Sequence, residues 1–454
     1  MSENMFDRAA ITEFRFVRWE FDPASGEARL VYAFDDGAEL VETIRFPAAP
    51  YKLSPERLSA VGRAIRLLHL IAGVSYYKAA APLRLRTSQP LEPSLQALLT
   101  EVYELGLGEF AYRNHLQLRG RLQFLSGDGD DAPGAAPVLG LSRHALVAIG
   151  GGKDSLVSIE ALRRAGVAQT VSWIGSAPLI RACAERTGLP LLNIERKLSP
   201  LLFEYNRQGA LNGHIPVTAV NSAILCVAAL LHDADQVVFS NEHSASYGSL
   251  IPGTGEVNHQ WSKGWDFERD FADYLRGFVA ADLSYYSLLR PFSELAVARQ
   301  FAKLDRYDAH FSSCNRNFHL LGERPAQRWC GECPKCRFVF LALAPFMPKP
   351  RLMGIFGRNL LDEPEQAPGF DALLEYGDHK PFECVGEGRE SRAALASLAG
   401  SPTWREDALV ARFVEEIVPQ LTEQELALAP LLEAAHDHGI PAALWGPLLE
   451  DFRA

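Results

Sequence analysis

Residues 145–155 read ALVAIGGGKDS, an apolar run that breaks into three glycines. The aliphatic residues are typical of a buried parallel strand, and Leu156, Ile159 and Leu162 recur at helical spacing after the glycines. A turn from a strand into a helix is therefore expected between them. Glycines allow a sharp turn and bring backbone N–H groups close to an anion at the positive end of the helix. The stretch predicts a phosphate-binding loop.

The residues after the glycines distinguish this loop from a Walker A motif, because Lys153 is followed by Asp154 rather than by Ser or Thr. The loop resembles instead the SGGxDS loop of the PP-loop ATP pyrophosphatases, with Gly150 at the usual position of the first serine. Those enzymes split ATP between the α and β phosphates and adenylate a substrate oxygen. The resemblance implies that ATP binds at Gly150, Gly151, Gly152, Lys153, Asp154 and Ser155. A glycine-rich turn without a ligand is the alternative.

The composition is that of a globular protein, and 454 residues are enough for two or three domains. The formal net charge of −11 and the even mixing of signs argue against nucleic acid as the main ligand, because phosphate backbones bind clustered Lys and Arg. The first residues, MSENMFD, are polar and acidic, so we expect no signal peptide. The most apolar windows, 223–231 and 338–347, are too short to span a bilayer. We expect a cytoplasmic protein without nucleic-acid or membrane partners, whose thiols stay reduced.

Three domains are predicted, at 1–135, 136–345 and 346–454. The first contains period-two patterning around Pro, Gly and Asp turns from 11 to 47, which is typical of an antiparallel sheet, followed by helices. The acidic, turn-rich segment 126–134 marks its end. The last domain has apolar stripes interrupted by prolines, which indicates a mostly helical region.

Strands and helices alternate in the middle domain after the glycines. Strands are expected at 171–174, 191–194 and 237–240, and helices at 179–187 and 217–231. This alternation predicts an α/β fold with a doubly wound parallel sheet, in which ligands bind beyond the carboxyl ends of the strands.

Polar residues follow one of these strands directly, in the sequence NEHSAS at 241–246. Asn241 is predicted to contact the nucleotide, and Glu242 and His243 to face the substrate, because their side chains can donate, accept and titrate. A polar strand exit without a ligand is the alternative. His214 precedes the predicted helix at 217–231 and could be a ligand-facing base, although a lone histidine more often has a structural role.

Four cysteines have the spacing of a metal site. Cys330, Cys333 and Cys336 follow one another at two-residue intervals, and fifteen residues separate Cys314 from Cys330. Four thiolates fit a closed tetrahedral zinc site, whose role would be to fasten the end of the ATP domain. Metal-free thiols, a redox pair or an iron–sulfur cluster are the alternatives.

Two families share these motifs. Over residues 141–345 the chain resembles the 7-cyano-7-deazaguanine synthases, which are PP-loop enzymes; the shared positions are the GGGKDS loop, Pro216, Asn221, Asn241, Ser313-Cys314 and the Cys330–Cys336 run. Over its whole length the chain is similar to the UDP-N-acetylmuramoyl-L-alanyl-L-glutamate epimerases of bacterial cell-wall synthesis. That similarity adds the β-rich start, the SNEHS sequence at 240–244 and the sequence KPFECVGE at 380–387.

The second resemblance implies an epimerase that uses ATP and Mg²⁺ to invert the terminal glutamate of a UDP-linked muramoyl dipeptide, releasing AMP and diphosphate. The chemistry is reasonable, because a carboxylate makes its α-proton barely acidic. Adenylation removes that charge and lets the carbanion delocalise as an enolate. An acid and a base must then reach the two faces of the α-carbon, and amides, Lys or Mg²⁺ would stabilise the oxyanion.

Candidates for the proton-transfer pair are His214, Glu242, His243, His379, Glu383 and Cys384. Glu383 and Cys384 lie in a segment rich in Pro, Phe and Gly, which predicts a loop that could close over the site. A buried, inert thiol is the alternative for Cys384. Arginines of the first or last domain could hold the UDP diphosphate, but the sequence singles out none of them.

Two other functions fit the same motifs. One is a PP-loop ligase or amidating enzyme that acts on a small carboxylic acid. The other is a regulator that binds ATP and zinc without catalysis, which the intact Lys153, Asp154 and Ser155 argue against.

Overall fold

The glycines join a strand to a helix, as predicted. β6 (Ala145–Ala148) leads through Gly150–Gly152, the glycine loop, into α5 (Lys153–Arg164). The computed structural model describes residues 6–127, 134–251, 254–318, 325–377 and 380–454.

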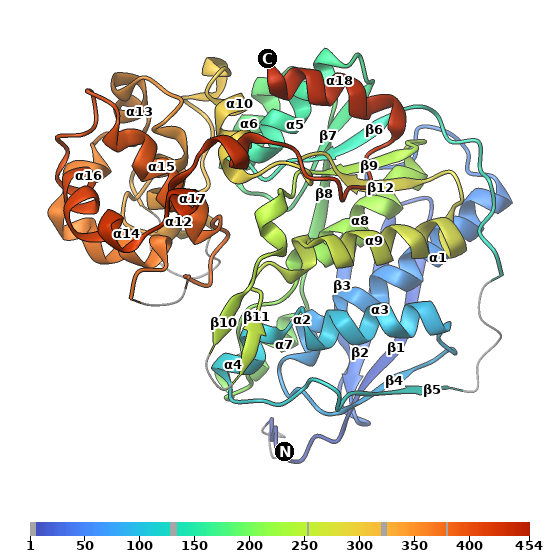
Figure 1. The fold of residues 1–454 in the computed structure, drawn as a ribbon. Coiled ribbons are helices and arrows are strands. Elements are labelled where there is room, and N and C mark those ends of the chain that lie inside the picture. The colour runs from blue at the N-terminus through green and yellow to red at the C-terminus, as the bar shows by residue number, and fades with distance from the viewer. Residues whose placement is uncertain (1–5, 128–133, 252–253, 319–324, 378–379) are drawn as a thin grey trace.

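Within the described residues, ten strands form one mostly parallel sheet at the centre of the molecule (Figure 1). Their order is β12-β9-β6-β7-β8-β3-β2-β1-β4-β5. The other nine strands are β1 (Glu13–Asp22), β2 (Glu27–Phe34), β3 (Leu40–Arg45), β4 (Arg84–Thr87), β5 (Gln123–Ser126), β7 (Gln169–Ile174), β8 (Leu191–Lys197), β9 (Gln236–Phe239) and β12 (Ser284–Ser287).

The five strands β8-β7-β6-β9-β12 are all parallel, which confirms the predicted α/β class. The chain places β7 and β8 on one side of β6, and then β9 and β12 on the other side. The direction of winding therefore reverses between β6 and β9. In open α/β sheets, ligands bind in the crevice at the carboxyl ends of the strands at such a reversal.

The amino-terminal strands continue this sheet. β1, β2 and β3 form the predicted antiparallel meander. β3 then pairs with β8 in antiparallel register, with Thr43 opposite Lys197, so the meander is not a separate sheet. A buried ion pair between Glu42 and Arg196 (2.7 Å) fastens the junction. Most of the predicted boundary segment 126–134 lies outside the described residues, and the division into three domains stays a prediction.

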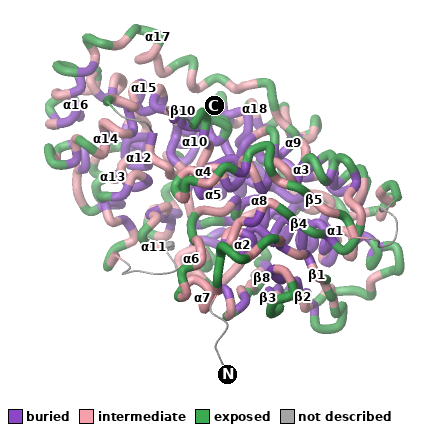
Figure 2. Tube along the Cα trace, turned by 90° about the horizontal axis from the view of Figure 1, so that it is seen from below, coloured by how far each residue is buried: buried purple, intermediate pink, exposed green. Residues whose placement is uncertain are grey.

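Two apolar cores cover the two faces of the sheet, because neighbouring residues of a strand point to opposite sides. In β6, Leu146 belongs to the core that contains α1 and α8, and Val147 to the core that contains α5 and α10. Figure 2 shows the buried lengths of α5 and α8 in the interior. The helices around the sheet are α1 (Pro55–Ala72), α2 (Val74–Tyr77), α3 (Pro93–Glu104), α4 (Gly108–Arg113), α6 (Pro178–Thr187), α7 (Pro200–Arg207), α8 (Val217–Leu231), α9 (Trp265–Tyr274) and α10 (Glu294–Phe301).

One helical segment, Pro55–Tyr77, is long and apolar enough to cross a membrane by length and composition alone. In this structure 78% of its most apolar window is buried. Its apolar residues pack against α8 and the sheet, and so they belong to the protein core.

The carboxyl-terminal region is helical, as predicted, and much of it forms a separate group of helices beside the sheet (Figure 1). Prolines divide it into short elements. Its helices are α12 (Pro334–Leu343), α13 (Lys349–Phe356), α14 (Ala367–Leu374), α15 (Gly388–Ala399), α16 (Ala408–Arg412), α17 (Glu423–Leu426) and α18 (Ala442–Arg453), and α11 (Asn315–Phe318) precedes them.

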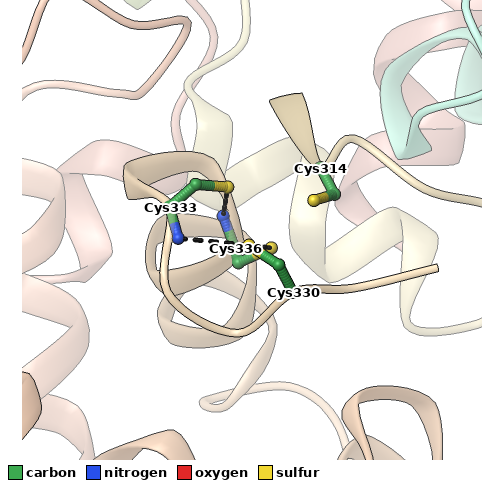
Figure 3. A group of neighbouring side chains, drawn as sticks. All are labelled: Cys314, Cys330, Cys333 and Cys336. Carbon is green, nitrogen blue, oxygen red and sulfur yellow. Dashed lines mark hydrogen bonds between the residues drawn. The ribbon is translucent and has the colours of Figure 1, made fainter. Parts of the chain in front are cut away.

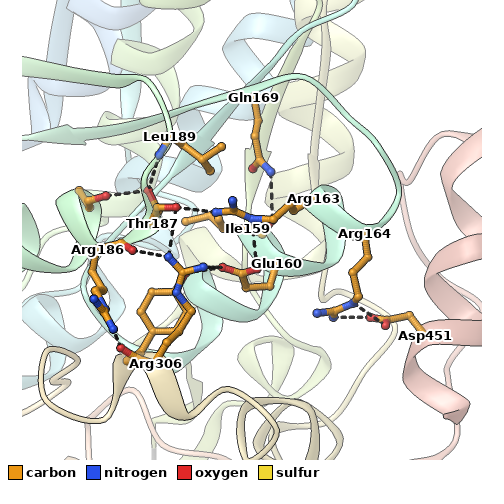
Figure 4. A network of polar contacts seen from close by, with 12 residues as sticks. Ile159, Glu160, Arg163, Arg164, Gln169, Arg186, Thr187, Leu189, Arg306 and Asp451 are labelled. Carbon is orange, nitrogen blue, oxygen red and sulfur yellow. Dashed lines mark hydrogen bonds and ion pairs between the residues drawn. The ribbon is translucent and has the colours of Figure 1, made fainter.

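The last helix, α18, returns to the sheet. The ring of Phe452 stacks on Phe292 with a centroid distance of 3.7 Å, and Asp451 accepts two hydrogen bonds of 2.6 Å from Arg164 of α5 (Figure 4). Arg306 and Arg186 donate to each other's backbone carbonyls in the same network. The Arg164–Asp451 pair fastens the outer side of α5, the helix that begins at the glycine loop.

Candidate active site

The glycine loop requires glycine at two of its positions. Gly151 has a φ of +82°, a left-handed conformation that favours glycine. A Cβ atom at Gly152 would lie 2.6 Å from the Oγ of Ser313. The N–H of Ser312 donates to the carbonyl of Gly151 (2.9 Å) and holds the turn from outside. At Gly150, nothing lies within 4 Å of a Cβ position, so this side of the loop is open.

An inner cavity of about 340 Å³ lies against the loop, at the carboxyl ends of β6 and β9. This is the crevice at which the winding of the sheet reverses, where α/β folds bind ligands. Its wall is polar at the glycine loop and at Ser240 and Asn241, which follow β9. It is apolar at Trp173 and Phe239. The polar lining residues include Gly150, Gly152, Asp154, Ser155, Thr218, Asn221, Ser240, Asn241, Lys263, Ser312, Ser313 and Lys335.

Two of the predicted nucleotide contacts, Gly151 and Lys153, do not line the inner cavity. The side chain of Lys153 is 1% exposed and forms ion pairs with Asp154 and with Glu294 of α10. Burial alone would lower the pKa of Lys153, but these two carboxylates raise it, so the ammonium is charged. The side chain does not line the inner cavity. Lys263 and Lys335 are the ammonium groups that line it.

Lys263 also contacts Cys384, because its Nζ lies 3.1 Å from the Sγ of that residue. Burial would raise the pKa of the Cys384 thiol, but the charge of Lys263 and a hydrogen bond with His259 lower it to about 5. Cys384 is therefore a thiolate at neutral pH. The thiolate is the nucleophilic and basic form of cysteine.

His259 links Cys384 to two further residues of the same cluster. Its Nδ1 is hydrogen-bonded to the carboxylate of Glu109, on α4. Burial would lower the pKa of His259, but its bonds with Cys384 and Glu109 raise it to about 9. The ring of His214 lies 4.1 Å from that of His259 between centroids, and burial lowers the pKa of His214 to about 3, so it is neutral. We call Cys384, Lys263, His259, Glu109 and His214 the thiol cluster.

The segment that carries Cys384 is a loop, as predicted, and neighbours hold it from several sides. Lys335 donates to the backbone carbonyl of Cys384, and Gln260 to that of Val385 (3.5 Å). The ring of Phe382 contacts that of Tyr112, on α4, with centroids 5.8 Å apart. The loop thus connects the amino-terminal part of the chain to the carboxyl-terminal helices. His379, another predicted candidate, lies outside the described residues.

The remaining predicted site residues differ in burial and in their contacts. Glu383 is half-buried, and burial raises the pKa of its carboxyl to about 7. Glu242 is 5% exposed, and its backbone carbonyl accepts a hydrogen bond from the buried Arg290 (2.9 Å). His243 begins the short helix η1 (His243–Ser246), and its side chain is exposed. Asn241 is buried, lines the inner cavity and donates to Ser287 (2.9 Å).

The four predicted cysteine ligands converge, as Figure 3 shows. Their sulfur atoms lie within 4.8 Å of one another, and those of Cys330 and Cys336 are 3.7 Å apart. A tetrahedral zinc ion with bonds of about 2.3 Å would place its sulfurs about 3.8 Å apart. Backbone N–H groups donate to the sulfurs of Cys330 (3.3 and 3.4 Å) and Cys333 (3.4 Å), which favours thiolates. This cysteine tetrad fits a structural zinc ion.

The tetrad is directly linked to the inner cavity. Cys314 follows Ser312 and Ser313, which contact the glycine loop. Lys335 lies between Cys333 and Cys336 in the sequence, lines the inner cavity and reaches the Cys384 loop. An ion in the tetrad would therefore fix both a wall of the inner cavity and one of its cations.

Five residues of the site were not predicted from the sequence: Glu109, His259, Lys263, Lys335 and Glu294. Only Lys335 had a local signal, its position within the cysteine run. Glu109 and His259 are 150 residues apart in the sequence, so no spacing rule relates them.

Two family models with the same family name match almost the entire chain. A family model described as the MurL N-terminal domain matches residues 5–288, and one described as the MurL C-terminal domain matches residues 310–428. The first match extends across the predicted boundary near residue 135. No solved structure matches the chain.

Three relatives are named UDP-N-acetyl-alpha-D-muramoyl-L-alanyl-L-glutamate epimerase. The protein from Xanthomonas oryzae pv. oryzae is 66% identical over 98% of this chain and 99% of its own length. The protein from Salinispora tropica is 45% identical over 89% of this chain and 88% of its own length. The protein from a Micromonospora species is 44% identical over 94% of this chain and 96% of its own length.

Proposed function

The chain belongs to the MurL family, and we propose that it is an ATP-dependent epimerase that inverts the terminal L-glutamate of UDP-N-acetylmuramoyl-L-alanyl-L-glutamate to D-glutamate in peptidoglycan synthesis. The names of the three relatives support this reaction and substrate. The glycine loop and the order of the five parallel strands support nucleotide binding of the PP-loop type. The proposal includes a cytoplasmic location, with which the free state of all seven cysteines is compatible.

The inner cavity is the proposed ATP site. Its open glycine amides and Ser155 would hold the phosphates at the start of α5. Burial would raise the pKa of Asp154, but Lys153 lowers it, so this carboxylate is charged. Mg²⁺ prefers oxygen ligands, and Asp154 is the cavity-lining carboxylate that fits it. Asn221 and Asn241 offer amides to the remainder of the nucleotide.

ATP would supply activation of the substrate. A carboxylate oxygen of the glutamate attacks the α-phosphorus, and diphosphate leaves. The resulting acyl adenylate has no negative charge next to its α-carbon, so the electron pair of the C–H bond can delocalise into the carbonyl when a base takes the proton. Return of a proton to the opposite face inverts the centre. Water then attacks the acyl carbon. The bond between that carbon and the phosphate oxygen breaks, AMP leaves with the electron pair, and the free carboxylate is restored.

Cys384 is the proposed group that exchanges the proton on one face of the α-carbon. Its thiolate is stabilised by Lys263 and His259, and a general base needs to be deprotonated at the working pH. Lys263 is in position to stabilise the developing enolate oxygen as well, since it contacts both Cys384 and the inner cavity. Glu383 and His214 are titratable neighbours of Cys384, and they are the candidates for proton exchange on the other face of the α-carbon.

One observation carries this proposal: Lys263 lines the cavity at the glycine loop and touches the thiolate of Cys384. A site for nucleotide transfer and a carbon base are thus adjacent. Zinc in the cysteine tetrad would have a structural role, because all four ligand positions are taken by protein sulfurs.

The test is incubation of the protein with ATP, Mg²⁺ and the L,L-nucleotide in D₂O, followed by chiral analysis and mass spectrometry of the glutamate. We expect D-glutamate with one deuterium at the α-carbon, together with AMP and diphosphate. An amidated product that depends on ammonia would identify a ligase instead. No turnover, or release of ADP, would contradict the proposal.

A further inference from the structure

A second, larger cavity lies outside the site described so far. This outer cavity measures about 740 Å³, which is within the range of roughly 300–1,000 Å³ that small-molecule sites occupy. Its wall comes from the end of α3, from α4, from the segment 115–121, from Thr254 and β11 (Gly255–Val257), and from the residues that follow β11.

The outer cavity and the thiol cluster share three segments of chain. On α4, Gly108 lines the cavity and its neighbour Glu109 belongs to the cluster. After β11, Asn258 lines the cavity and the adjacent His259 belongs to the cluster. In the short helix η2 (Trp261–Lys263), Trp261 lines the cavity and Lys263 contacts Cys384.

A ligand in the outer cavity would therefore lie next to the thiol cluster, on α4, Asn258 and η2, while ATP would occupy the inner cavity. The substrate of the proposed reaction needs such an arrangement, because its nucleotide is separated from the reacting glutamate by a sugar and an alanine.

The outer cavity holds two guanidinium groups that can pair with an anion, and its described carboxylates are hydrogen-bonded or paired elsewhere. Its three acidic residues have partners: Glu104 accepts from the N–H of Gly120 (2.9 Å), Glu256 from that of Gly248 (3.1 Å), and Asp266 pairs with Arg269 (3.1 Å). The guanidinium groups of Arg119 and Arg121 are exposed and make no ion pair within the part of the chain that the structure describes. Two such guanidiniums match a diphosphate, which they can bind through pairs of hydrogen bonds.

The remaining lining suits a nucleoside. The partly exposed ring of Tyr112 is an aromatic face on which a base can stack, and the largely buried indole of Trp261 adds apolar wall. Asn258, Thr254 and Gln117 offer polar groups for sugar hydroxyls. Among the described residues that line it, the outer cavity has no cradle of glycine amides like that of the inner cavity, which distinguishes the two sites.

We infer that the outer cavity binds the nucleoside diphosphate of the substrate, with Arg119 and Arg121 on the diphosphate, so that the peptide reaches Cys384 past α4 and η2. This inference rests on the proposed function for the identity of the substrate. The binding of a nucleoside diphosphate at these residues can be measured without any turnover.

The experiment is calorimetric titration of the full chain with UDP, in the presence and absence of an ATP analogue that has a methylene group between its α and β phosphates. We expect UDP and the analogue to bind together. Arg119→Ala/Arg121→Ala should weaken UDP binding about tenfold to a hundredfold, because each lost bond is to a charged group, and should leave binding of the analogue unchanged. The matched control, Arg405→Ala/Arg453→Ala, removes two exposed arginines from the carboxyl-terminal region.

In turnover assays the same double variant should raise KM for the UDP-linked substrate and leave KM for ATP unchanged. Competition between UDP and the analogue for one site would overturn the inference, as would equal UDP affinity in both double variants. If the protein epimerises the substrate but the arginine variant behaves like the control, the inference fails and the proposed function stands. If UDP binding depends on these arginines but no glutamate is inverted, the proposed function fails and the nucleotide site stands.

Discussion

The inner cavity and the thiol cluster are neighbours, but they are built in different ways. The wall of the inner cavity at the start of α5 comes from one stretch, Gly150–Ser155, whose backbone N–H groups are the proposed phosphate contacts. The thiol cluster takes its five side chains from α4, from the segment before α8, from the residues around η2 and from the Cys384 loop. A binding site made of backbone depends on local conformation. A site for proton transfer depends on side chains that only the folded chain brings together.

The largest effect is expected at Cys384. Cys384→Ala removes the proposed base, and general acid–base groups contribute about 10²- to 10⁴-fold to a rate. We expect solvent deuterium exchange at the glutamate to fall by that factor, while binding of the ATP analogue is retained. Loss of deuterium exchange with unchanged binding of the analogue would show that the thiol cluster and the inner cavity have separate roles.

Cys226→Ala is the matched control for this experiment. Cys226 is also a free thiol, but it is fully buried in α8 and belongs to the core, whereas Cys384 is partly exposed. Its substitution should reduce stability without slowing the exchange. Full exchange in the Cys384 variant would exclude Cys384 as the base.

The next effect concerns the cysteine tetrad, which supports both regions. We expect purified protein to contain about one zinc ion per chain and Cys314→Ser to lose most of it, because a closed structural site needs all four ligands. The variant should unfold at a lower temperature, as followed by calorimetry. It should also bind the ATP analogue less tightly, since Ser312 and Ser313 lose their anchor. Metal analysis that finds no zinc in the wild type would contradict this prediction.

A smaller effect is expected from Lys263→Met, which acts on the thiol cluster through charge. The Cys384 thiolate exists above its pKa of about 5, so its reaction with iodoacetamide should fall as the pH drops through 5. Removing the ammonium should raise that pKa by about one to three units and move the transition to higher pH. The control Lys52→Met replaces an exposed lysine and should leave the pH of this transition unchanged.

The pH dependence of turnover should follow the same groups. The rate should rise with the Cys384 thiolate above pH about 5 and fall above about 9, where His259 loses its proton. An acidic limb at the same pH in wild type and Lys263→Met would separate Cys384 from the reaction.

The smallest effect is expected in the glycine loop, at Gly152→Ala. The new methyl group would meet Ser313, and such overpacking costs about 1–3 kcal/mol unless the serine rotates away. Affinity for the ATP analogue should fall accordingly in calorimetric titration. Gly150→Ser is the comparison, because a Cβ there meets nothing within 4 Å and similar loops carry serine at this position. Equal losses in both variants would argue against the close contact with Ser313.

The sequence predicted the elements around the glycine loop well. The strand, the turn and α5 are present, and α6 ends at Gly188, which has the left-handed φ of +68° that favours glycine. Local patterns suffice there, because hydrophobic period and glycine geometry are properties of short segments. The junction of β3 with β8 was missed, since the pairing of Thr43 with Lys197 leaves no signal in either strand.

The direction of the lysine side chains was likewise not predictable from local sequence patterns. Lys153 lies within the loop motif, so a phosphate contact was the natural prediction, yet its ammonium is buried between Asp154 and Glu294. Lys263 has no motif and faces the cavity. A motif fixes where the backbone goes, whereas the direction of a long side chain depends on the charges that the fold places around it.

The sequence by itself determined the family, the parallel α/β core, the glycine loop and the clustering of four cysteines. All of these follow from residues that are close together in the chain or from similarity along it. The tertiary structure decided which ammonium groups line the inner cavity, that Cys384 is held as a thiolate, and that a second cavity adjoins it. Those properties arise from burial and from charges that are far apart in the sequence, and electrostatic interactions depend on distances that only the folded protein defines.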